Sequence, residues 1–244
     1  MFQLAMNAQS QCPSSSGFTR LELLALVATL GLFTTVVLPA LAGTRRGSDL
    51  AACVNNLRQI GRAYQVWASE HNDDAPHYLP ISQGGILQHP LAGNAWFQFS
   101  WISNELATPR ILACPSDPTK LVARDFSRSA DGGFLNAGYC NNAVSYFVGL
   151  HAIRFVPGSF LTGDRNVQTY GSVACSAVSF GAFMGRLSPL DPFWTNNLHG
   201  LWGNLLTYDG QVRTVSNQTM TDLYPKARDP GMNPTDFSTH FLMP

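Results

Sequence analysis

The sequence predicts an α+β fold in which a long N-terminal α-helix packs on a small antiparallel β-sheet head with long loops. Three observations predict it. An uncharged, mostly apolar run extends from Leu23 to Gly43, an apolar spacing of three and four residues follows it, and turn-forming residues are frequent in the remainder of the 244-residue chain. The first two features indicate one helix with a membrane half and an amphipathic half. The third indicates short strands joined by loops.

The composition limits the classes of protein and partner. Hydrophobic residues make up 45% of the chain and charged residues only 12%, about half the charged share usual for a soluble domain. The formal net charge is zero, with 15 basic and 15 acidic residues. Because binding to nucleic acid depends on excess positive charge, we expect no nucleic-acid partner.

The N-terminal segment carries the most specific pattern. Residues 1–16 are polar and contain no Lys or Arg, and the apolar run is preceded by Gly17-Phe18-Thr19-Arg20-Leu21-Glu22. The run of 21 uncharged residues would rise about 30 Å as a helix, which is the thickness of a bilayer core. We therefore expect residues 18–45 to form a transmembrane and assembly helix. A carboxylate at its start is costly in lipid, so Glu22 is predicted to be functional.

Other interpretations of the apolar run remain open. A secretory signal would end at a small-residue cleavage site, and Ala40-Leu41-Ala42 before Gly43 fits that pattern. An uncleaved membrane anchor and a buried helix of a soluble protein are further alternatives. The flanking charge opposes the usual orientation rule, because Arg45 and Arg46 follow the run while the leader has no positive charge.

An amphipathic helix is predicted to continue into the head over residues 46–75. Its apolar positions are Leu50, Cys53, Val54, Leu57, Ile60, Tyr64, Trp67 and Ala68, and polar residues occupy the positions between them. Steps of three and four residues place these side chains on one helical face. The pattern ends at His71-Asn72-Asp73-Asp74, and Pro76 stops the helix.

Residues 76–244 are expected to form one β-rich extracytoplasmic head. Candidate strands are 143–150, 172–180, 203–208 and 211–216, and the last two flank Asp209-Gly210, which is typical of a two-residue hairpin turn. Residues 117–138 and 157–171 are predicted to be loops. The tail from Pro225 is predicted to be irregular because it is rich in proline.

The N-terminal motif resembles that of type IV pilins and type II secretion pseudopilins. The resemblance consists of a short leader ending in Gly17, then Phe18, Thr19, Leu21 and Glu22 before a long apolar helix, and Pro39 falls where that family often has a kinking proline. It implies that a prepilin peptidase removes residues 1–17 and methylates the new N-terminus at Phe18. It also implies that Glu22 and Pro39 serve assembly of the helix into a filament.

Motifs in the head extend the resemblance to a group of prepilin-like proteins with a domain of unknown function. The matching segments are Cys53 to Gly61, Cys114-Pro115-Ser116-Asp117, Ser145-Tyr146, and His199 followed by Asp209-Gly210. Gln211 departs from the group, which commonly has His there. We interpret His199, Asp209 and Gly210 as a structural motif in which His199 and Asp209 meet and fix the loops.

The cysteines and acidic residues indicate which disulfides and metal sites the chain could form. Four cysteines follow the predicted leader and allow three pairings, among which we favour Cys53–Cys114 because it would tie the helix to the head. No CxxC spacing is present, so a thiolate zinc site is not expected. The resemblance implies calcium as a cofactor, with Asp117, Asp125 and Asp131 as candidate ligands. No catalytic motif occurs, and we do not expect an enzyme.

The resemblance implies a structural subunit, either pilin or pseudopilin, of a type IV pilus-like or type II secretion filament. Its partners would be prepilin peptidase, other copies of itself or other pilin-like subunits, and the bacterial inner membrane. It would lie in the inner membrane with its head in the periplasm before assembly, and then in a periplasmic or cell-surface filament. The alternative is a membrane-anchored extracytoplasmic protein that binds a ligand such as a glycan through Trp96, Phe97, Phe99 and Trp101.

Overall fold

The computed structural model describes residues 19–168, 183–187, 192–223 and 239–244; at 36, 38–46, 183–187 and 239–240 only the backbone is described. The chain divides into two compact units, Met1–Arg45 and Arg46–Pro244. Helix α1 (Arg20–Ser69) has 50 residues and contributes to both units. Each unit is described by itself below.

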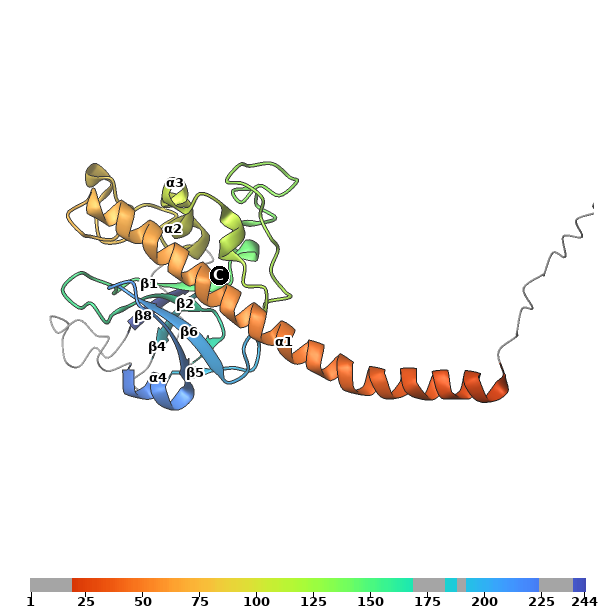
Figure 1. Cartoon of the computed structure of the whole chain (residues 1–244). Coiled ribbons are helices and arrows are strands. Elements are labelled where there is room, and N and C mark those ends of the chain that lie inside the picture. Colours follow the sequence, from red (N-terminus) through yellow and green to blue (C-terminus); the bar gives the residue numbers. More distant parts are fainter. Residues whose placement is uncertain (1–18, 169–182, 188–191, 224–238) are drawn as a thin grey trace, which may run out of the picture. The chain divides into compact units, whose positions relative to one another are not determined.

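In the second unit, the part of α1 from Arg46 onward packs on a β-sheet (Figure 1). Its buried side chains are those that the spacing of three and four residues predicts, with Cys53, Leu57 and Ile60 fully buried and Tyr64 and Trp67 nearly so. The helix approaches the sheet closely at Gly61, where an added Cβ would lie 2.9 Å from Cδ1 of Leu206. A side chain at this position would push the helix away from the sheet.

The main sheet has six antiparallel strands in the order β4-β8-β1-β2-β6-β7. Their bounds are β1 (Tyr146–Gly149), β2 (Phe160–Asp164), β4 (Phe183–Leu187), β6 (Trp202–Thr207), β7 (Val212–Ser216) and β8 (Thr239–Met243). A second sheet pairs β3 (Val167–Gln168) with β5 (Phe193–Trp194). The last strand of the chain thus lies between β4 and β1 inside the main sheet.

Both faces of the main sheet are covered, and side chains alternate between two apolar clusters. The cluster under α1 includes Tyr146, Val148, Leu161, Leu206 and Leu242. The cluster on the opposite face includes Phe147, Phe160, Leu205, Val215 and Phe241, together with Met220 of helix α4 (Asn217–Leu223). This alternation is the period of two that a strand imposes on its side chains.

Short helices lie between α1 and the first strand, and they complete the cluster under α1. They are η1 (Ile81–Gln83), α2 (Ala95–Trp101), α3 (Ser103–Leu106), η2 (Pro109–Leu112) and η3 (Cys140–Ala143). From α2, Phe99 is fully buried in this cluster, and Trp96 and Trp101 pack against it. Phe99 therefore belongs to the core, whereas Trp96 and Trp101 pack against it and stay partly exposed.

The predicted membrane half of the helix is wrong, and the predicted fold class is corrected accordingly. No helix within the described residues is both long and apolar enough to span a bilayer. The predicted transmembrane helix and inner-membrane location are corrected by the same finding.

The predicted head also needs correction, because it holds two sheets and several short helices. Strand β2 lies where residues 157–171 were expected to be loop, and β8 lies in the tail expected to be irregular. All five residues of β2 are buried, so it has no alternating polar face that would reveal it in the sequence. The candidate strand 172–180 lies outside the described residues.

The loop between β6 and β7 differs from the two-residue turn expected at Asp209-Gly210. Thr207 N–H donates to the Gln211 carbonyl (3.0 Å), and Gly210 N–H donates to the Thr207 carbonyl (2.9 Å). The loop therefore contains three residues, with Gly210 at a φ of 82° and no positive φ at Asp209. A three-residue loop needs the left-handed conformation only at its last position, whereas the expected two-residue turn needs it at both.

Candidate functional site

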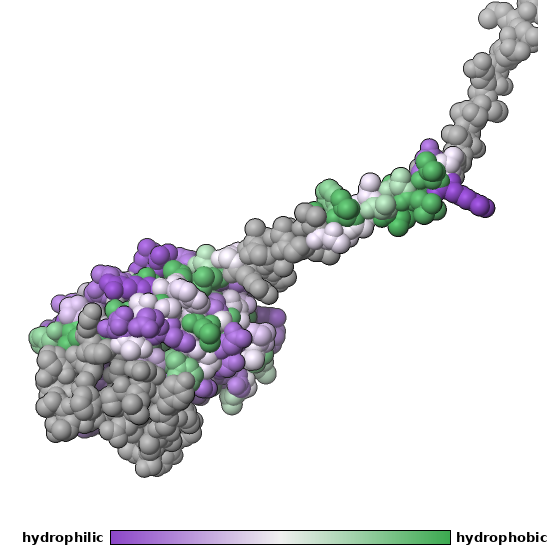
Figure 2. Space-filling view, turned by 90° about the horizontal axis from the view of Figure 1, so that it is seen from below, coloured by the Kyte–Doolittle hydropathy of each residue, from purple (hydrophilic) through white to green (hydrophobic). Residues whose placement is uncertain are grey.

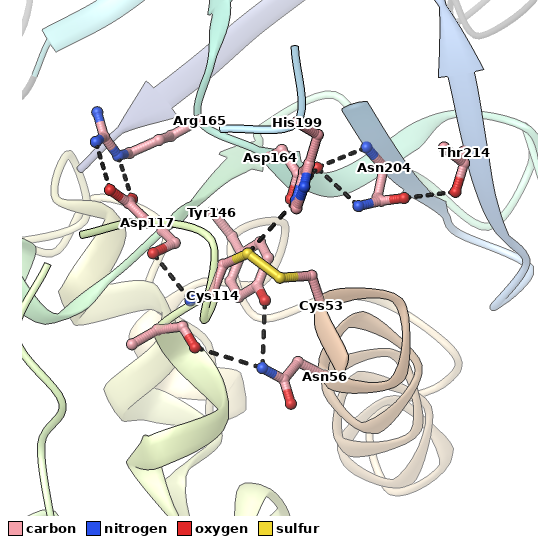
Figure 3. Close-up of a disulfide and its surroundings, with 12 residues drawn as sticks. Cys53, Asn56, Cys114, Asp117, Tyr146, Asp164, Arg165, His199, Asn204 and Thr214 are labelled. Atoms are coloured by element: carbon pink, nitrogen blue, oxygen red, sulfur yellow. Dashed lines mark hydrogen bonds and ion pairs between the residues drawn. A yellow bond between two sulfur atoms is a disulfide. The ribbon is translucent and has the colours of Figure 1, made fainter. Parts of the chain in front are cut away.

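A disulfide joins the long helix to the head at the centre of a buried polar cluster (Figure 3). It links Cys53 of α1 to Cys114, just after η2, with a Cα–Cα distance of 5.2 Å and a sequence separation of 61. This is the pairing favoured from the sequence. Beside it, Asn56 Nδ2 donates to the Ala113 carbonyl and to Tyr146 Oη, each at 3.4 Å. Covalent and polar contacts thus fix one turn of α1.

His199 lies against the disulfide and against a buried carboxylate. Its Nε2 is 3.4 Å from Sγ of Cys114 and 3.5 Å from Oδ2 of Asp164. The imidazole is almost fully buried, and burial lowers its pKa below the ordinary value although Asp117 and Asp49 oppose that shift. With its proton on Nε2, the neutral ring can donate to the carboxylate.

Asp164 connects His199 to strands β6 and β7 through a chain of hydrogen bonds. Asn204 donates to Asp164 Oδ2 from its backbone N–H (2.7 Å) and from Nδ2 (2.9 Å), and Thr214 Oγ1 donates to Asn204 Oδ1 (2.6 Å). Burial raises the pKa of Asp164 to about 7, even though the bonds from Asn204 favour the ionised form. Within the described residues, Asp164 Oδ1 has no hydrogen-bond partner.

A second ion pair, with Asp117 buried and Arg165 partly exposed, lies near the disulfide (Figure 3). Arg165 donates from Nε (2.6 Å) and Nη2 (2.8 Å) to the two oxygens of Asp117, and Thr119 Oγ1 also donates to that carboxylate. Burial alone would raise the pKa of Asp117, but the hydrogen bonds from Arg165 and Thr119 hold it below its usual value. Such bidentate pairs are geometrically specific, so this one fixes the loop after Cys114 to the end of β2.

The arrangement is suited to holding elements together. Cys53, Cys114 and His199 are the one group in the described part of the chain whose ligand atoms are close enough to share a metal ion. The two sulfur atoms are bonded to each other, whereas a metal ion binds cysteine as a thiolate. While the disulfide is intact, the two cysteines therefore do not act as metal ligands.

A depression of about 750 Å³ lies next to His199 and is also lined by Asp49, Ser116 and Asn196.

His199, Asp209 and Gly210 were expected to form a structural motif, but Asp209 and Gly210 make their contacts with residues other than His199. Asp209 accepts hydrogen bonds from Thr207 Oγ1 and from Gln211 N–H, and thus shapes its own loop. Gly210 packs against α1, where an added Cβ would lie 2.3 Å from Nε2 of Gln65. The expected contact of His199 with Asp209 is replaced by the contact with Asp164. No sequence motif flanks Asp164. It lies beside His199 because it is the last residue of strand β2.

The candidate calcium ligands have separate protein partners. Asp117 binds Arg165, Asp131 Oδ2 accepts from Arg124 Nη1 (2.9 Å), and Asp125 Oδ1 accepts from Ser127 N–H (2.8 Å). In the described ranges, these carboxylates are not grouped closely enough to share one ion. These three residues therefore do not form a shared calcium site, and calcium binding itself stays a prediction.

At the N-terminus of α1, Thr19 and Glu22 form a capping box. Thr19 N–H donates to Glu22 Oε2 (2.8 Å), and Glu22 N–H donates to Thr19 Oγ1 (3.3 Å). These bonds satisfy two donors of the helix end, and the bond from Thr19 N–H lowers the pKa of Glu22. Gly17 and Phe18 lie outside the described residues, as does the side chain of Pro39.

Searches of protein-family models, curated proteins and solved structures found no match to this chain.

Proposed function

We propose that the chain is a structural subunit of a type IV pilus-like or type II secretion filament, assembled through the N-terminal part of α1. One observation carries the proposal: this segment exposes many large apolar side chains, some of which are visible on the face shown in Figure 2. They are Leu21, Leu23, Leu24, Leu26, Val27, Leu30, Leu32 and Phe33, each 52–78% exposed. Contiguous apolar surface of this kind marks an interaction site.

The polar side chains of the same segment are suited to burial among other helices. The hydroxyl of Thr29 donates to the carbonyls of Ala25 and Leu26, and the hydroxyls of Thr34 and Thr35 donate to carbonyls one turn earlier. A hydroxyl bonded within its own helix can leave water without losing a partner. Each large apolar side chain that another subunit buries contributes roughly 1.5–3 kcal/mol.

Glu22 has two roles in this proposal. In the single chain it caps the helix through Thr19. In the filament, its charge pairs with the amine created when prepilin peptidase cuts before Phe18 in a neighbouring subunit. A charge buried between subunits is costly unless it is paired, so the pairing fixes the register between copies. Head-to-tail contacts that do not close into a ring then produce a filament.

The test compares two exposed apolar residues, one in each unit. Leu30 in the N-terminal segment is 57% exposed, and Val122 in the second unit is 58% exposed. The full chain is produced with a prepilin peptidase as wild type, Leu30→Glu and Val122→Glu. Assembly is followed by sedimentation and negative-stain electron microscopy.

Wild type and Val122→Glu are expected to sediment as filaments, and Leu30→Glu is expected to stay unassembled with an unchanged circular dichroism spectrum. A wild-type chain that is cleaved before Phe18 and yet remains monomeric would contradict the proposal. Equal assembly of Leu30→Glu and Val122→Glu would contradict the role given to the helix.

A further inference from the structure

A groove lies between α1 and the β6–β7 loop. It is lined by Arg58, Arg62 and Gln65 from the helix and by Gly210, Gln211 and Val212 from the loop, with a volume of about 370 Å³. Its lining therefore carries two positive charges and no negative charge. The volume lies in the range of pockets that hold small molecules.

The fold places both arginines on one wall of the groove. Arg58 and Arg62 are four residues apart on α1, and Gln65 follows three residues later, so the three side chains share one helical face. The opposite wall is held in place because Gln65 Nε2 donates to the Asp209 carbonyl (3.4 Å). Gly210 allows this approach, since any Cβ there would meet the Gln65 amide.

Among the described side chains, the two arginines of the groove have no carboxylate beside them, in contrast to three arginines elsewhere in the second unit. Arg124, Arg154 and Arg165 each lie within 4.0 Å of an Asp carboxylate. For Arg58 and Arg62, no carboxylate partner exists among the residues that the structure describes. The nearby Asp209 lines a different depression, and its carboxylate accepts hydrogen bonds from Thr207 Oγ1 and from the Gln211 N–H.

We infer that this groove binds a small anionic ligand, a sugar or polyol bearing a phosphate, sulfate or carboxylate group. The guanidinium groups of Arg58 and Arg62 bind the oxyanion, because planar guanidinium matches such groups with paired N–H donors. Gln65 Oε1 and Gln211 Nε2 bind hydroxyl groups of the ligand body, because Gln65 Nε2 already bonds to the Asp209 carbonyl and Gln211 Oε1 to Arg213 Nη2. The groove is larger than one oxyanion requires, which leaves room for that body. This inference is independent of filament assembly.

The test is a titration of the full chain with glucose 6-phosphate, glucuronate and inorganic phosphate, followed by calorimetry. Wild type is compared with the double variant Arg58→Gln/Arg62→Gln. Arg110→Gln serves as the matched control, since Arg110 is an exposed arginine outside the groove. All of the substituted side chains are exposed, so the variants should keep the wild-type fold.

Saturable binding of a sugar probe is expected in wild type and in Arg110→Gln. The double variant should bind it about tenfold more weakly or worse, because it loses the charge-assisted hydrogen bonds. Binding should also weaken as the salt concentration rises. No saturable binding of any probe, or equal binding by the double variant, would overturn the inference.

Two further outcomes are also decisive. If inorganic phosphate binds as tightly as glucose 6-phosphate, the groove recognises only an oxyanion and the assignment of a sugar ligand is wrong. If no probe binds but the double variant changes the sedimentation coefficient of the chain, the arginines contact a second copy and the small-molecule site is excluded.

Discussion

The two units of the chain are stabilised by different kinds of contact. In the described N-terminal part of α1, every side-chain hydrogen bond joins residues three or four positions apart. In the second unit, the polar cluster joins residues far apart in the sequence, such as Cys53 with Cys114 and Asp164 with Asn204. The first unit leaves its apolar side chains exposed, and the second buries them in two clusters.

Because of this difference, we expect that the stability of the second unit and the assembly through the first unit can be altered separately. Substitutions in the disulfide cluster should change the unfolding of the second unit and leave the apolar segment unchanged. Substitutions in the apolar segment should change assembly without unfolding the second unit. The predictions below test this separation, beginning with the largest effect.

Removal of the disulfide should cause the largest loss of stability. The bond closes a separation of 61 residues, and the entropy of such a loop in the unfolded chain corresponds to about 4 kcal/mol. Cys53→Ala/Cys114→Ala should therefore lower the free energy of unfolding by roughly 2–5 kcal/mol in urea titrations. The control is Cys140→Ala, because Cys140 is a free thiol. Equal effects of the two variants would contradict the role given to the disulfide.

Asp164 should make stability depend on pH. Its pKa is about 7 in the folded protein, whereas an unperturbed aspartate side chain has a pKa of 3.8. Between these values the folded state holds a proton that the unfolded state has lost, so the free energy of unfolding falls as pH rises. Asp164→Asn removes this decline, and its stability relative to wild type should rise by roughly 2–4 kcal/mol between about pH 4 and pH 8.

The measurement for Asp164 is urea unfolding of both proteins at each pH. Other titrating groups such as His77, whose pKa is lowered by burial, affect both proteins alike and largely cancel in the difference. A difference between the two proteins that does not vary with pH would show that Asp164 is ionised over the whole range.

Gly210→Ala should cost less than loss of the disulfide. Its φ of 82° is unfavourable for alanine, and the new methyl group would displace the Gln65 amide. We expect a loss of about 1–2 kcal/mol in the free energy of unfolding. Gly158→Ala is the control, because no atom lies within 4 Å of its added Cβ. A similar change in both variants would show that the loop does not need glycine at 210.

Substitutions of Glu22 should have the smallest effect on folding. Glu22→Gln can still accept the hydrogen bond from Thr19 N–H, whereas Glu22→Ala cannot. Glu22→Ala should fray about one turn of helix in circular dichroism, and Glu22→Gln should not. Both variants should fail to form filaments, because both lose the charge. Filaments formed by Glu22→Gln would limit Glu22 to the capping role.

Local patterns in the sequence predicted the features that depend on neighbouring residues. The buried face of α1 followed from its spacing, and β6 and β7 lie near their expected positions because turn residues separate them. The strands β2 and β8 were missed because they are recognised only by their pairing with distant strands. In the same way, Asp164 becomes a partner of His199 only when β2 and β6 pair. In the sequence, Arg58 and Arg62 show only the spacing of one helical face. The opposite wall of the groove comes from the distant β6–β7 loop, which the sequence does not place beside them.

The first residue of the mature chain, measured by intact mass and N-terminal analysis of a filament pellet, tests the central claim most directly. The account predicts a chain that begins at N-methylated Phe18 and keeps Glu22 and the apolar segment. A mature chain that begins at Gly43 would lack that segment and would contradict the account.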